Sequence, residues 1–385
     1  MTALRMKNIS SAVFFELARH KEQLRANGRR VIDLGIGSPD LPPPAGVIRA
    51  LEHALRSPDA FRYAGTEGTA ELRAAVVAYM KRRFGVQVDP DRETLALIGA
   101  QDGLAHLPLA LVNPGEVILA PDPGYPIYFA AAHLAGAVIE TLPLRPENGY
   151  RPDFSAIPPD VLRRTRLMIL NYPHNPTAAT APHAILEEAV TLARKHGFLI
   201  LHDAAYAELV MDGRPSPTLL QIDGGKDVGL ELHSLSKTFN FAGARVAFAV
   251  GNSQALDALR TLKSQIDYGL FLPLQAAGVA ALEDDGAFVA RLRAEYSLRR
   301  DAFLAPLRDA GWAINPPPAT MFVWARLPEG GSSRDFAARL LEESGVGCIP
   351  GIGFGTHGEG FVRFALVEPP DILAEAAHNI AATLR

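Results

Sequence analysis

The middle of the chain alternates short apolar runs with longer amphipathic stretches. The runs are almost continuously apolar, as expected of strands buried on both faces, and they read TLALIG, EVILAPD, RLMILNYP, GFLILHD, VGLELHS and RVAFAVG. Helical periodicity covers stretches between several of them, including 100–112 and 181–196. This order predicts an α/β fold with an open, mostly parallel sheet between helices.

Helical periodicity also dominates both flanks of this region. Helices are predicted at 12–27, 44–56, 68–84, 253–264, 272–283, 286–310, 334–344 and 370–384. Two apolar runs in the tail, ATMFVWARL and FVRFALV, predict a smaller α+β unit. Near the N-terminus, the short run VIDLGIG precedes SPDLPPP, where proline excludes helix. We therefore expect a large domain at 45–284 and a small domain formed by 1–44 together with 285–385.

Composition narrows the class of protein mainly by exclusion. A length of 385 residues suits two domains, and the net charge of −4 offers no basic field for nucleic acid or an anionic membrane. The single cysteine, Cys348, excludes an internal disulfide and fits a reducing compartment. The start, MTALRMKNIS, lacks the apolar segment of a secretory signal, and the apolar window 125–139 is too short to span a bilayer. We expect a soluble, cytoplasmic protein.

Polar residues follow the apolar runs, and in open α/β sheets ligands bind beyond the carboxyl ends of the strands. After TLALIG, Ala100 and Gln101 open a helix whose free amides suit a phosphate, although a plain helix start is the better explanation of this segment taken alone. After EVILAPD, Tyr125 lies in a proline-bracketed turn, where it could stack on a flat ring or merely pack. Asn175 precedes a proline after RLMILNYP, a common turn pattern, and its amide could reach a ring hydroxyl.

The run GFLILHD ends on Asp203, where an unpaired carboxylate would be costly. Its natural partner is a cation, and a protonated pyridine nitrogen would serve. Tyr206 follows three residues later and could reach a hydroxyl on the same ring. His202 is better explained as a core histidine with satisfied hydrogen bonds.

The run VGLELHS leads into SLSKTFNFAGAR, which carries Lys237 directly after a buried strand. Burial lowers the pKa of an ammonium group and so frees neutral amine for Schiff-base formation with a carbonyl. The hydroxyls of Ser234 and Ser236, together with Arg245, suit a phosphate. An aldehyde and a phosphate on one molecule suggest pyridoxal phosphate. A solvated surface lysine explains the loop alone equally well, but the convergence of the strand ends favours the cofactor site.

These motifs are together typical of one family. N-P-T, D-x-x-Y and S-x-S-K…G-x-R occur in that order, and nearly the whole chain resembles the fold type I aminotransferases of classes I and II. The resemblance implies a seven-stranded sheet, pyridoxal 5′-phosphate as cofactor, and no metal. It also implies transfer of an amino group between an amino acid and a 2-oxo acid, with 2-oxoglutarate and glutamate as the expected pair, by a ping-pong mechanism.

The resemblance further implies a role for each residue around the cofactor ring. Lys237 is implied to be the Schiff-base lysine and the acid–base catalyst. Asp203 is implied to pair with the pyridine nitrogen, and Tyr125 to stack on the ring. Asn175 and Tyr206 are implied to hold the ring hydroxyl.

The phosphate and substrate ends of the site are implied in the same way. The residues implied to bind the phosphate are Ala100, Gln101, Ser234, Ser236 and Arg245. Tyr63 is implied to reach the phosphate of the neighbouring subunit, so a homodimer with shared active sites follows. Arg363 in FVRF is implied to clamp the substrate α-carboxylate, with Gly37 and Asn175 beside it.

Within the family, PDPGYPIY, HDAAYAE and HSLSKTFN most resemble the LL-diaminopimelate branch, which makes LL-diaminopimelate the first-choice substrate. DYGLFLPLQ and NPTA also resemble the alanine–glutamate branch, so alanine or aspartate stays open. Two positions depart from the common pattern. Ala178 replaces a glycine, which we expect to restrict that turn, and Ala244 replaces a tryptophan, which we expect to widen the local packing.

Three rival functions remain. GFGTHG at 353–358 matches the dinucleotide fingerprint G-x-G-x-x-G, but it precedes a predicted strand instead of following one and opening a helix. A β-lyase or decarboxylase on the same scaffold would carry identical cofactor residues. A regulator built on this fold would need a DNA-binding module, for which we find no basic segment.

Overall fold

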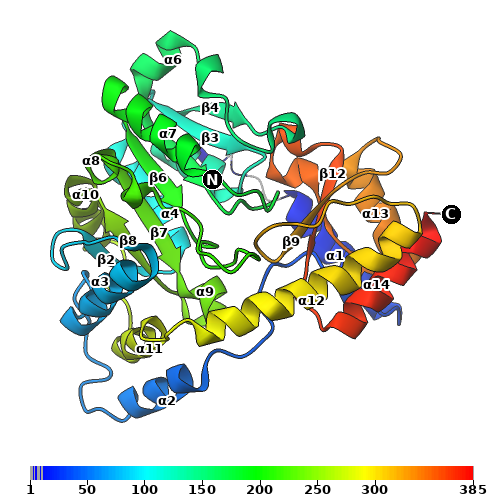
Figure 1. The fold of residues 1–385 in the computed structure, drawn as a ribbon, viewed down its shortest axis with the longest axis horizontal. Coiled ribbons are helices and arrows are strands. Elements are labelled where there is room, and N and C mark those ends of the chain that lie inside the picture. Colours follow the sequence, from blue (N-terminus) through cyan, green and yellow to red (C-terminus); the bar gives the residue numbers. More distant parts are fainter. Residues whose placement is uncertain (1–2, 4, 7–8, 10–11, 385) are drawn as a thin grey trace.

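The computed structural model describes residues 3, 5–6, 9 and 12–384. The chain forms a larger and a smaller lobe, and the long helix α12 (Ala287–Asp309) runs from one to the other (Figure 1). Among the described residues, none of the helices combines the length and the apolar character that crossing a bilayer requires.

The larger lobe is built on a seven-stranded sheet with the order β2-β8-β7-β6-β5-β3-β4. Its strands are β2 (Thr94–Ile98), β3 (Val117–Asp122), β4 (Val138–Pro143), β5 (Thr165–Asn171), β6 (Leu199–Asp203), β7 (Gly229–Ser234) and β8 (Val246–Gly251). Strands β4, β3, β5, β6 and β7 run parallel, and β8 is antiparallel to both of its neighbours. The predicted mostly parallel sheet is confirmed.

Two features of this sheet were not visible in the apolar runs. Strand β4 lies at the edge and is mostly half-buried, so its sequence VIETLP lacks the continuous apolar character of a central strand. The reversed direction of β8 leaves no trace in hydrophobicity, because a strand buried on both faces is apolar whichever way it runs. As a consequence, the start of β8 lies at the rim where the other strands end.

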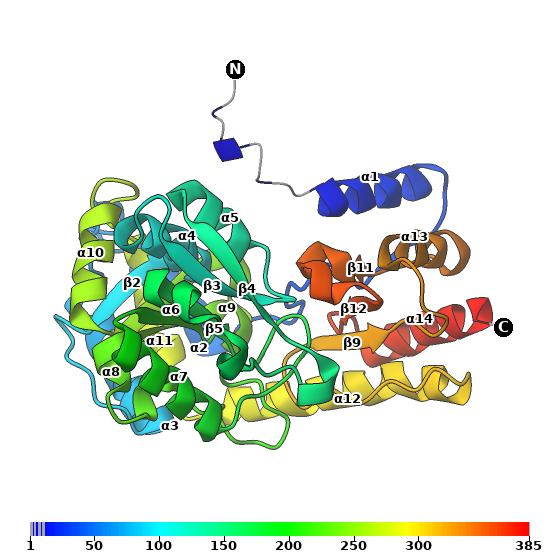
Figure 2. The ribbon, with the colours of Figure 1, turned by 90° about the horizontal axis from the view of Figure 1, so that it is seen from above.

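Helices cover both faces of the sheet (Figure 2). One face is covered by α4 (Ala100–Leu111), α5 (Ile127–Ala135) and α10 (Ser253–Lys263). The other face is covered by α3 (Ala70–Phe84), α6 (Pro159–Arg164), α7 (His183–His196) and α11 (Leu272–Leu282). The short helix α2 (Ala45–Ala54) packs against α11, and α8 (Gly225–Val228) precedes β7. Alternate residues of each strand feed the two apolar layers, which is why the runs read as continuously apolar.

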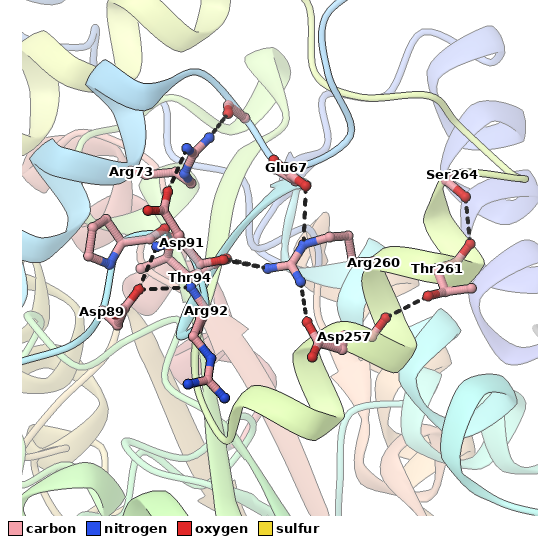
Figure 3. A network of polar contacts seen from close by, with 12 residues as sticks. Glu67, Arg73, Asp89, Asp91, Arg92, Thr94, Asp257, Arg260, Thr261 and Ser264 are labelled. Carbon is pink, nitrogen blue, oxygen red and sulfur yellow. Dashed lines mark hydrogen bonds and ion pairs between the residues drawn. The ribbon is translucent and has the colours of Figure 1, made fainter.

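A network of polar contacts holds the edge strand β2 in the larger lobe (Figure 3). The Arg260 guanidinium on α10 donates to the carbonyl oxygen of Asp91, 3.0 Å away, and lies 3.8 Å from the Glu67 carboxylate. Arg73 on α3 reaches the Asp91 carboxylate at 2.9 Å. The start of β2 is thereby tied to a helix on each face of the sheet.

The smaller lobe combines the N-terminal segment with the tail. Its strands are β1 (Ile32–Asp33), β9 (Phe322–Arg326), β10 (Val346–Gly347), β11 (Ile349–Pro350) and β12 (Phe361–Ala365). Strand β1, two residues of the VIDLGIG run, pairs in parallel with β10, and β11-β12-β9 form an antiparallel sheet. The helices are α1 (Ala12–Ala26), α13 (Ser333–Ser344) and α14 (Pro370–Thr383), and α1 lies beside α13 (Figure 2). The domain boundaries at 44/45 and 284/285 stay a prediction.

Candidate active site

A cavity of about 320 Å³ lies at the rim of the large sheet, beside residues of the smaller lobe. The predicted site residues that line it are Gly37, Ala100, Gln101, Tyr125, Asn175, Asp203, Tyr206, Ser234, Ser236, Lys237, Arg245 and Arg363. Most of them follow strand ends or open helices of the larger lobe, because parallel strands direct their carboxyl ends to one edge, whereas Gly37 and Arg363 come from the smaller lobe. Arg245 joins them because it directly precedes β8, the reversed strand.

Lys237 lies in the single turn α9 (Leu235–Thr238), immediately after β7. Its Nζ donates to the Gly37 carbonyl oxygen at 2.6 Å, so the amine points across the cavity to the smaller lobe. Burial, and then the positive charges of Arg363 and Arg245, lower the pKa of Lys237 to about 8. The amine is therefore partly neutral close to neutral pH, as a nucleophile or general base requires.

Asp203, the last residue of β6, is 5% exposed. Its carboxylate accepts hydrogen bonds from the Tyr128 hydroxyl at 2.7 Å and from the Ala205 amide at 3.2 Å. Burial raises the pKa of Asp203, and these two donors act in the opposite direction. Among the described residues, no basic side chain forms an ion pair with this carboxylate. A buried anion that faces a cavity without a counter-charge fits a protonated pyridine nitrogen.

Arg363 on β12 is 6% exposed and offers the opposite charge. Its guanidinium donates to Asn175 Oδ1 at 2.9 Å and to the Gly35 carbonyl oxygen at 2.7 Å. Its Nε is buried without a hydrogen-bond partner among the described residues, and burial lowers the pKa of the group to about 10. The guanidinium carbon lies 4.2 Å from the ring centre of Phe322 and 4.8 Å from that of Phe354. This cation therefore has room for an anionic ligand.

The other end of the cavity is suited to a phosphate. Helix α4 starts here, and the first amides of a helix have no intrahelical acceptor. Ser234 caps α9 by accepting from the Ser236 amide at 3.2 Å. Gly99, which precedes α4 at a φ of +75°, packs against Arg245, and a Cβ there would lie 2.2 Å from the guanidinium. Only glycine lets the arginine lie over this helix start.

Of the three tyrosines predicted for the site, two line the cavity and one lies outside it. Tyr125 donates from its hydroxyl to Gln101 Oε1 at 3.3 Å, and burial raises the pKa of both Tyr125 and Tyr206, so both stay neutral phenols. Tyr63 is 89% exposed and does not line the cavity of its own chain. Its ring contacts that of Tyr268, with centres 5.2 Å apart.

Three residues that shape the site were missed from the sequence: Tyr128, Asn171 and Gly99. Asn171 accepts from the Asn175 amide at 2.8 Å and donates to the Asp203 carbonyl oxygen at 2.8 Å, which links two strand ends. Its place at the end of RLMILN was a usable signal. Tyr128 has no such signal, because it lies inside α5, whose apolar sequence shows no helical pattern of polar and apolar positions.

His202 is fully buried, as expected of a core histidine, and its Nδ1 lies 2.8 Å from the Glu231 carboxylate. Its Nε2 has no hydrogen-bond partner among the described residues, so its hydrogen bonds are only partly satisfied. Ala178 is buried at a φ of +60°, so an alanine occupies a backbone conformation that glycine adopts without strain. Ala244 is partly buried against the apolar layer beneath α3 and α11.

The GFGTHG segment is not a dinucleotide-binding loop. It forms parts of the short 3₁₀ turns η6 (Gly351–Phe354) and η7 (Thr356–Gly358) and leads into β12 instead of opening a helix. The fingerprint needs a preceding strand and a following helix within a βαβ unit. The dinucleotide alternative is therefore rejected.

Comparison with known proteins agrees with this geometry. The family model for class I and II aminotransferases matches residues 29–380. The LL-diaminopimelate aminotransferase of Desulforudis audaxviator is 42% identical over 382 residues, which are 99% of this chain and 97% of that protein.

Solved structures agree as well. The substrate-bound structure of BacF from Bacillus subtilis has a TM-score of 0.96 at 37% identity and covers 100% of this chain and 98% of its own. A probable N-succinyldiaminopimelate aminotransferase from Thermus thermophilus has a TM-score of 0.92 at 41% identity and covers 96% of this chain and 100% of its own. The chain belongs to the class I and II aminotransferases and is a transaminase of fold type I that depends on pyridoxal 5′-phosphate.

Proposed function

We propose that this enzyme takes the amino group from LL-diaminopimelate and passes it to 2-oxoglutarate. The observation that carries the proposal is the arrangement of Lys237, Asp203 and Arg363 around one cavity, each buried or half-buried and none in an ion pair among the described residues. The choice of amino donor is supported by the relatives, several of them about 40% identical over nearly the whole chain, that are LL-diaminopimelate aminotransferases.

The polar groups of the cavity would hold the cofactor from three directions. The α4 amides at Ala100 and Gln101, the hydroxyls of Ser234 and Ser236, and Arg245 would bind its phosphate. Asp203 would pair with the ring nitrogen, and Tyr125 would stack on the ring. Asn175 and Tyr206 would donate to the ring hydroxyl, since Tyr206 stays a neutral phenol.

Lys237 would carry the proton in the reaction. When bound, pyridoxal phosphate supplies an aldehyde that takes up the amino group and a ring that accepts electrons from the substrate Cα. A lysine with a pKa of about 8 is a competent base at neutral pH and, once protonated, a competent acid. Its hydrogen bond to the Gly37 carbonyl oxygen keeps the amine aimed into the cavity.

Arg363 would bind the α-carboxylate of the substrate. A guanidinium pairs with a carboxylate through two parallel hydrogen bonds, and this guanidinium lacks a carboxylate partner among the described residues. Gly37 leaves the space for it, because a Cβ there would lie 2.7 Å from the Phe322 ring and 4.0 Å from the guanidinium.

The active unit would be a homodimer with shared sites. Aromatic side chains gather at the surface around 61–63 and 268–271, where Phe61 is 78% and Tyr63 89% exposed. The Phe61 and Phe271 rings lie 5.7 Å apart, so the two segments form one apolar patch. A patch of this kind on a folded protein is typical of an interface. A second copy would cover it and bring its Tyr63 to the phosphate.

The cytoplasm is the compartment that we propose for this enzyme. Cys348 is buried and free, and burial raises the pKa of its thiol, so it is chemically inert where it lies. A chain with one cysteine forms no internal disulfide, so an oxidising compartment would not stabilise its fold.

The substrate assignment is tested with holoenzyme and a panel of amino donors, with 2-oxoglutarate as acceptor. We expect the highest kcat/KM with LL-diaminopimelate, and glutamate as the product. N-Succinyl-LL-diaminopimelate is the second candidate, because the probable N-succinyldiaminopimelate aminotransferase of Thermus thermophilus is 41% identical to this chain. A higher kcat/KM with the succinylated compound, alanine or aspartate would overturn the first choice, and release of ammonia would point to a lyase.

A further inference from the structure

The GFGTHG segment docks on the last residue of strand β3. Asp122 is 3% exposed, and its carboxylate accepts from the Thr356 hydroxyl at 2.8 Å and from the His357 amide at 3.0 Å. The His357 ring lies within hydrogen-bond distance of the same carboxylate, at 3.1 Å. The Gly124 amide adds a bond of 2.7 Å to the Phe354 carbonyl oxygen. A single carboxylate of the large sheet thus anchors loop 351–358 of the smaller lobe.

Gly355 and Gly358 of this segment, and Gly351 just before it, lie in close contacts that leave no space for a side chain. A Cβ on Gly355 would lie 2.2 Å from the Asp122 carboxylate, and Gly355 adopts a φ of +127°. A Cβ on Gly351 would lie 1.8 Å from the Gly358 carbonyl oxygen, and one on Gly358 would lie 2.1 Å from that of Gly351. Gly355 therefore lets the loop approach the Asp122 carboxylate, and the contact of Gly351 with Gly358 closes the loop on itself.

The docked loop carries Phe354 into the active-site cavity. This ring is 1% exposed, lines the cavity, and lies 4.8 Å from the Arg363 guanidinium carbon. Phe322 lies 4.2 Å from the same carbon, so two aromatic rings flank one planar cation. Fork-like binding of a carboxylate depends on the orientation of the guanidinium plane. A contact that fixes the position of the Phe354 ring therefore also fixes the orientation of the Arg363 guanidinium.

We infer that Asp122 is a positioning residue for the transamination reaction. By anchoring loop 351–358, it holds Phe354 against the Arg363 guanidinium and so sets the affinity of the site for the α-carboxylate of the substrate. The inference rests on the proposed role of Arg363. Asp122 itself does not line the cavity, and its effect is on substrate binding and not on the proton transfers at Lys237.

The test is the half-reaction of the holoenzyme with L-glutamate, followed by cofactor absorbance, which separates the dissociation constant of the amino acid from the limiting rate. We expect Asp122→Ala to raise that constant by about 10- to 100-fold, because small displacements of binding groups have effects of this size. The limiting rate should change by less than about threefold, and the affinity for pyridoxal phosphate should not change, because neither depends on Arg363. The matched control is Asp153→Ala, which removes an exposed carboxylate that caps another loop, at 3.0 Å from the Ser155 amide.

A double-mutant cycle decides whether Asp122 acts through Phe354. Phe354→Leu should weaken L-glutamate binding, and adding Asp122→Ala to it should have little further effect, because both changes disturb one contact. Additive effects, or an unchanged dissociation constant in Asp122→Ala, overturn the inference. Should Asp122→Ala fail to fold, Thr356→Val removes only one of the donors and should still raise the constant by about fivefold; no increase in that variant also overturns it.

Arg363→Lys separates this inference from the proposed function. If Arg363→Lys leaves L-glutamate binding unchanged, the proposed role of Arg363 is wrong and the inference falls with it. If Arg363→Lys weakens binding and Asp122→Ala does not, only the inference is overturned.

Discussion

Burial changes the acid–base behaviour of the charged residues that face the cavity. It lowers the pKa of Lys237 to about 8 and that of Arg363 to about 10, and it raises the pKa of Asp203. Each shift disfavours the charged form, because a buried charge loses its hydration. Desolvation is the largest cause for all three groups, followed by neighbouring charges at Lys237 and Arg363 and by hydrogen bonds at Asp203.

The reactivity of Lys237 should follow its lowered pKa. In the apoprotein, the rate at which pyridoxal phosphate is captured should rise as the pH passes about 8 and level off above it, because only the neutral amine attacks. Stopped-flow absorbance over a pH series measures this. Arg363→Gln removes a repelling positive charge and should move the midpoint to higher pH, and Lys237→Ala should show no capture. A midpoint near the ordinary lysine value of 10.5 would contradict the prediction.

Tyr128 should control the ionisation of Asp203. Tyr128→Phe removes the 2.7 Å hydrogen bond to the carboxylate, and such a bond to a charged group contributes about 1.5–3 kcal/mol. The pKa of Asp203, already raised by burial, should rise further, so the acidic limb of kcat/KM against pH should move up by about one to two pH units. Tyr172→Phe is the control, since it loses a 2.8 Å bond to the Tyr150 carbonyl oxygen and no contact with Asp203. Coincident acidic limbs for Tyr128→Phe and the wild type would disprove this role.

At the scale of elements, one buried carboxylate joins three segments of the chain. Glu208 lies in the loop after β6, and both of its oxygens bind Arg83 at the end of α3, at 2.7 and 2.8 Å. It also accepts from Arg293 on α12 at 2.9 Å and from the Tyr79 hydroxyl at 3.0 Å. The start of α12, the helix that leads to the smaller lobe, is thereby fixed to the large one.

Glu208→Ala should destabilise the protein by about 3–5 kcal/mol, because it leaves two partly buried guanidinium groups without their counter-charge. Equilibrium unfolding in urea measures the change. Glu22→Ala is the comparison, since it breaks an exposed pair with Arg25 that contributes less than about 1 kcal/mol. Equal losses of stability in the two variants would rule out the network as a structural joint.

At the scale of the whole molecule, one chain leaves an aromatic surface patch uncovered. The aromatic patch around Phe61, Tyr63 and Tyr268 is much more exposed than the aromatic residues of the core. Tyr63 is also the one predicted site residue that lies outside the cavity of its own chain. Both observations support the proposed dimer.

If the proposed dimer forms through this patch, Phe61→Asp should convert it to monomers, because the change places a charge in an apolar interface; sedimentation equilibrium measures this. Leu298→Asp, at a residue 61% exposed on α12, is the control and should not change the mass of the particle in solution.

Mixed dimers of Lys237→Ala and Tyr63→Ala chains should have a higher transaminase activity than either parent, because one of their two sites is complete. No gain on mixing would contradict shared sites.

The sequence predicted the fold well where the physics is local. Apolar runs located the central strands, because burial on both faces makes a strand continuously apolar. The half-buried edge strand β4 and the apolar helix α5 could not be assigned, because their sequences show neither pattern. The residues at strand ends line the cavity as the rule for open α/β sheets predicts. Tyr128 could not be found in this way, because it lies in the middle of a helix.

From the sequence come the succession of most helices and strands along the chain, the side chains at the end of each central strand and, through the motifs, the family. These depend on residues near one another along the chain. Only the tertiary structure decided that Tyr128 meets Asp203, that Gly99 makes room for Arg245, and that Asp122 anchors the loop carrying Phe354. The physical reason is that such contacts join distant segments, and their partners are set by strand order and helix packing, which hydrophobic periodicity does not encode.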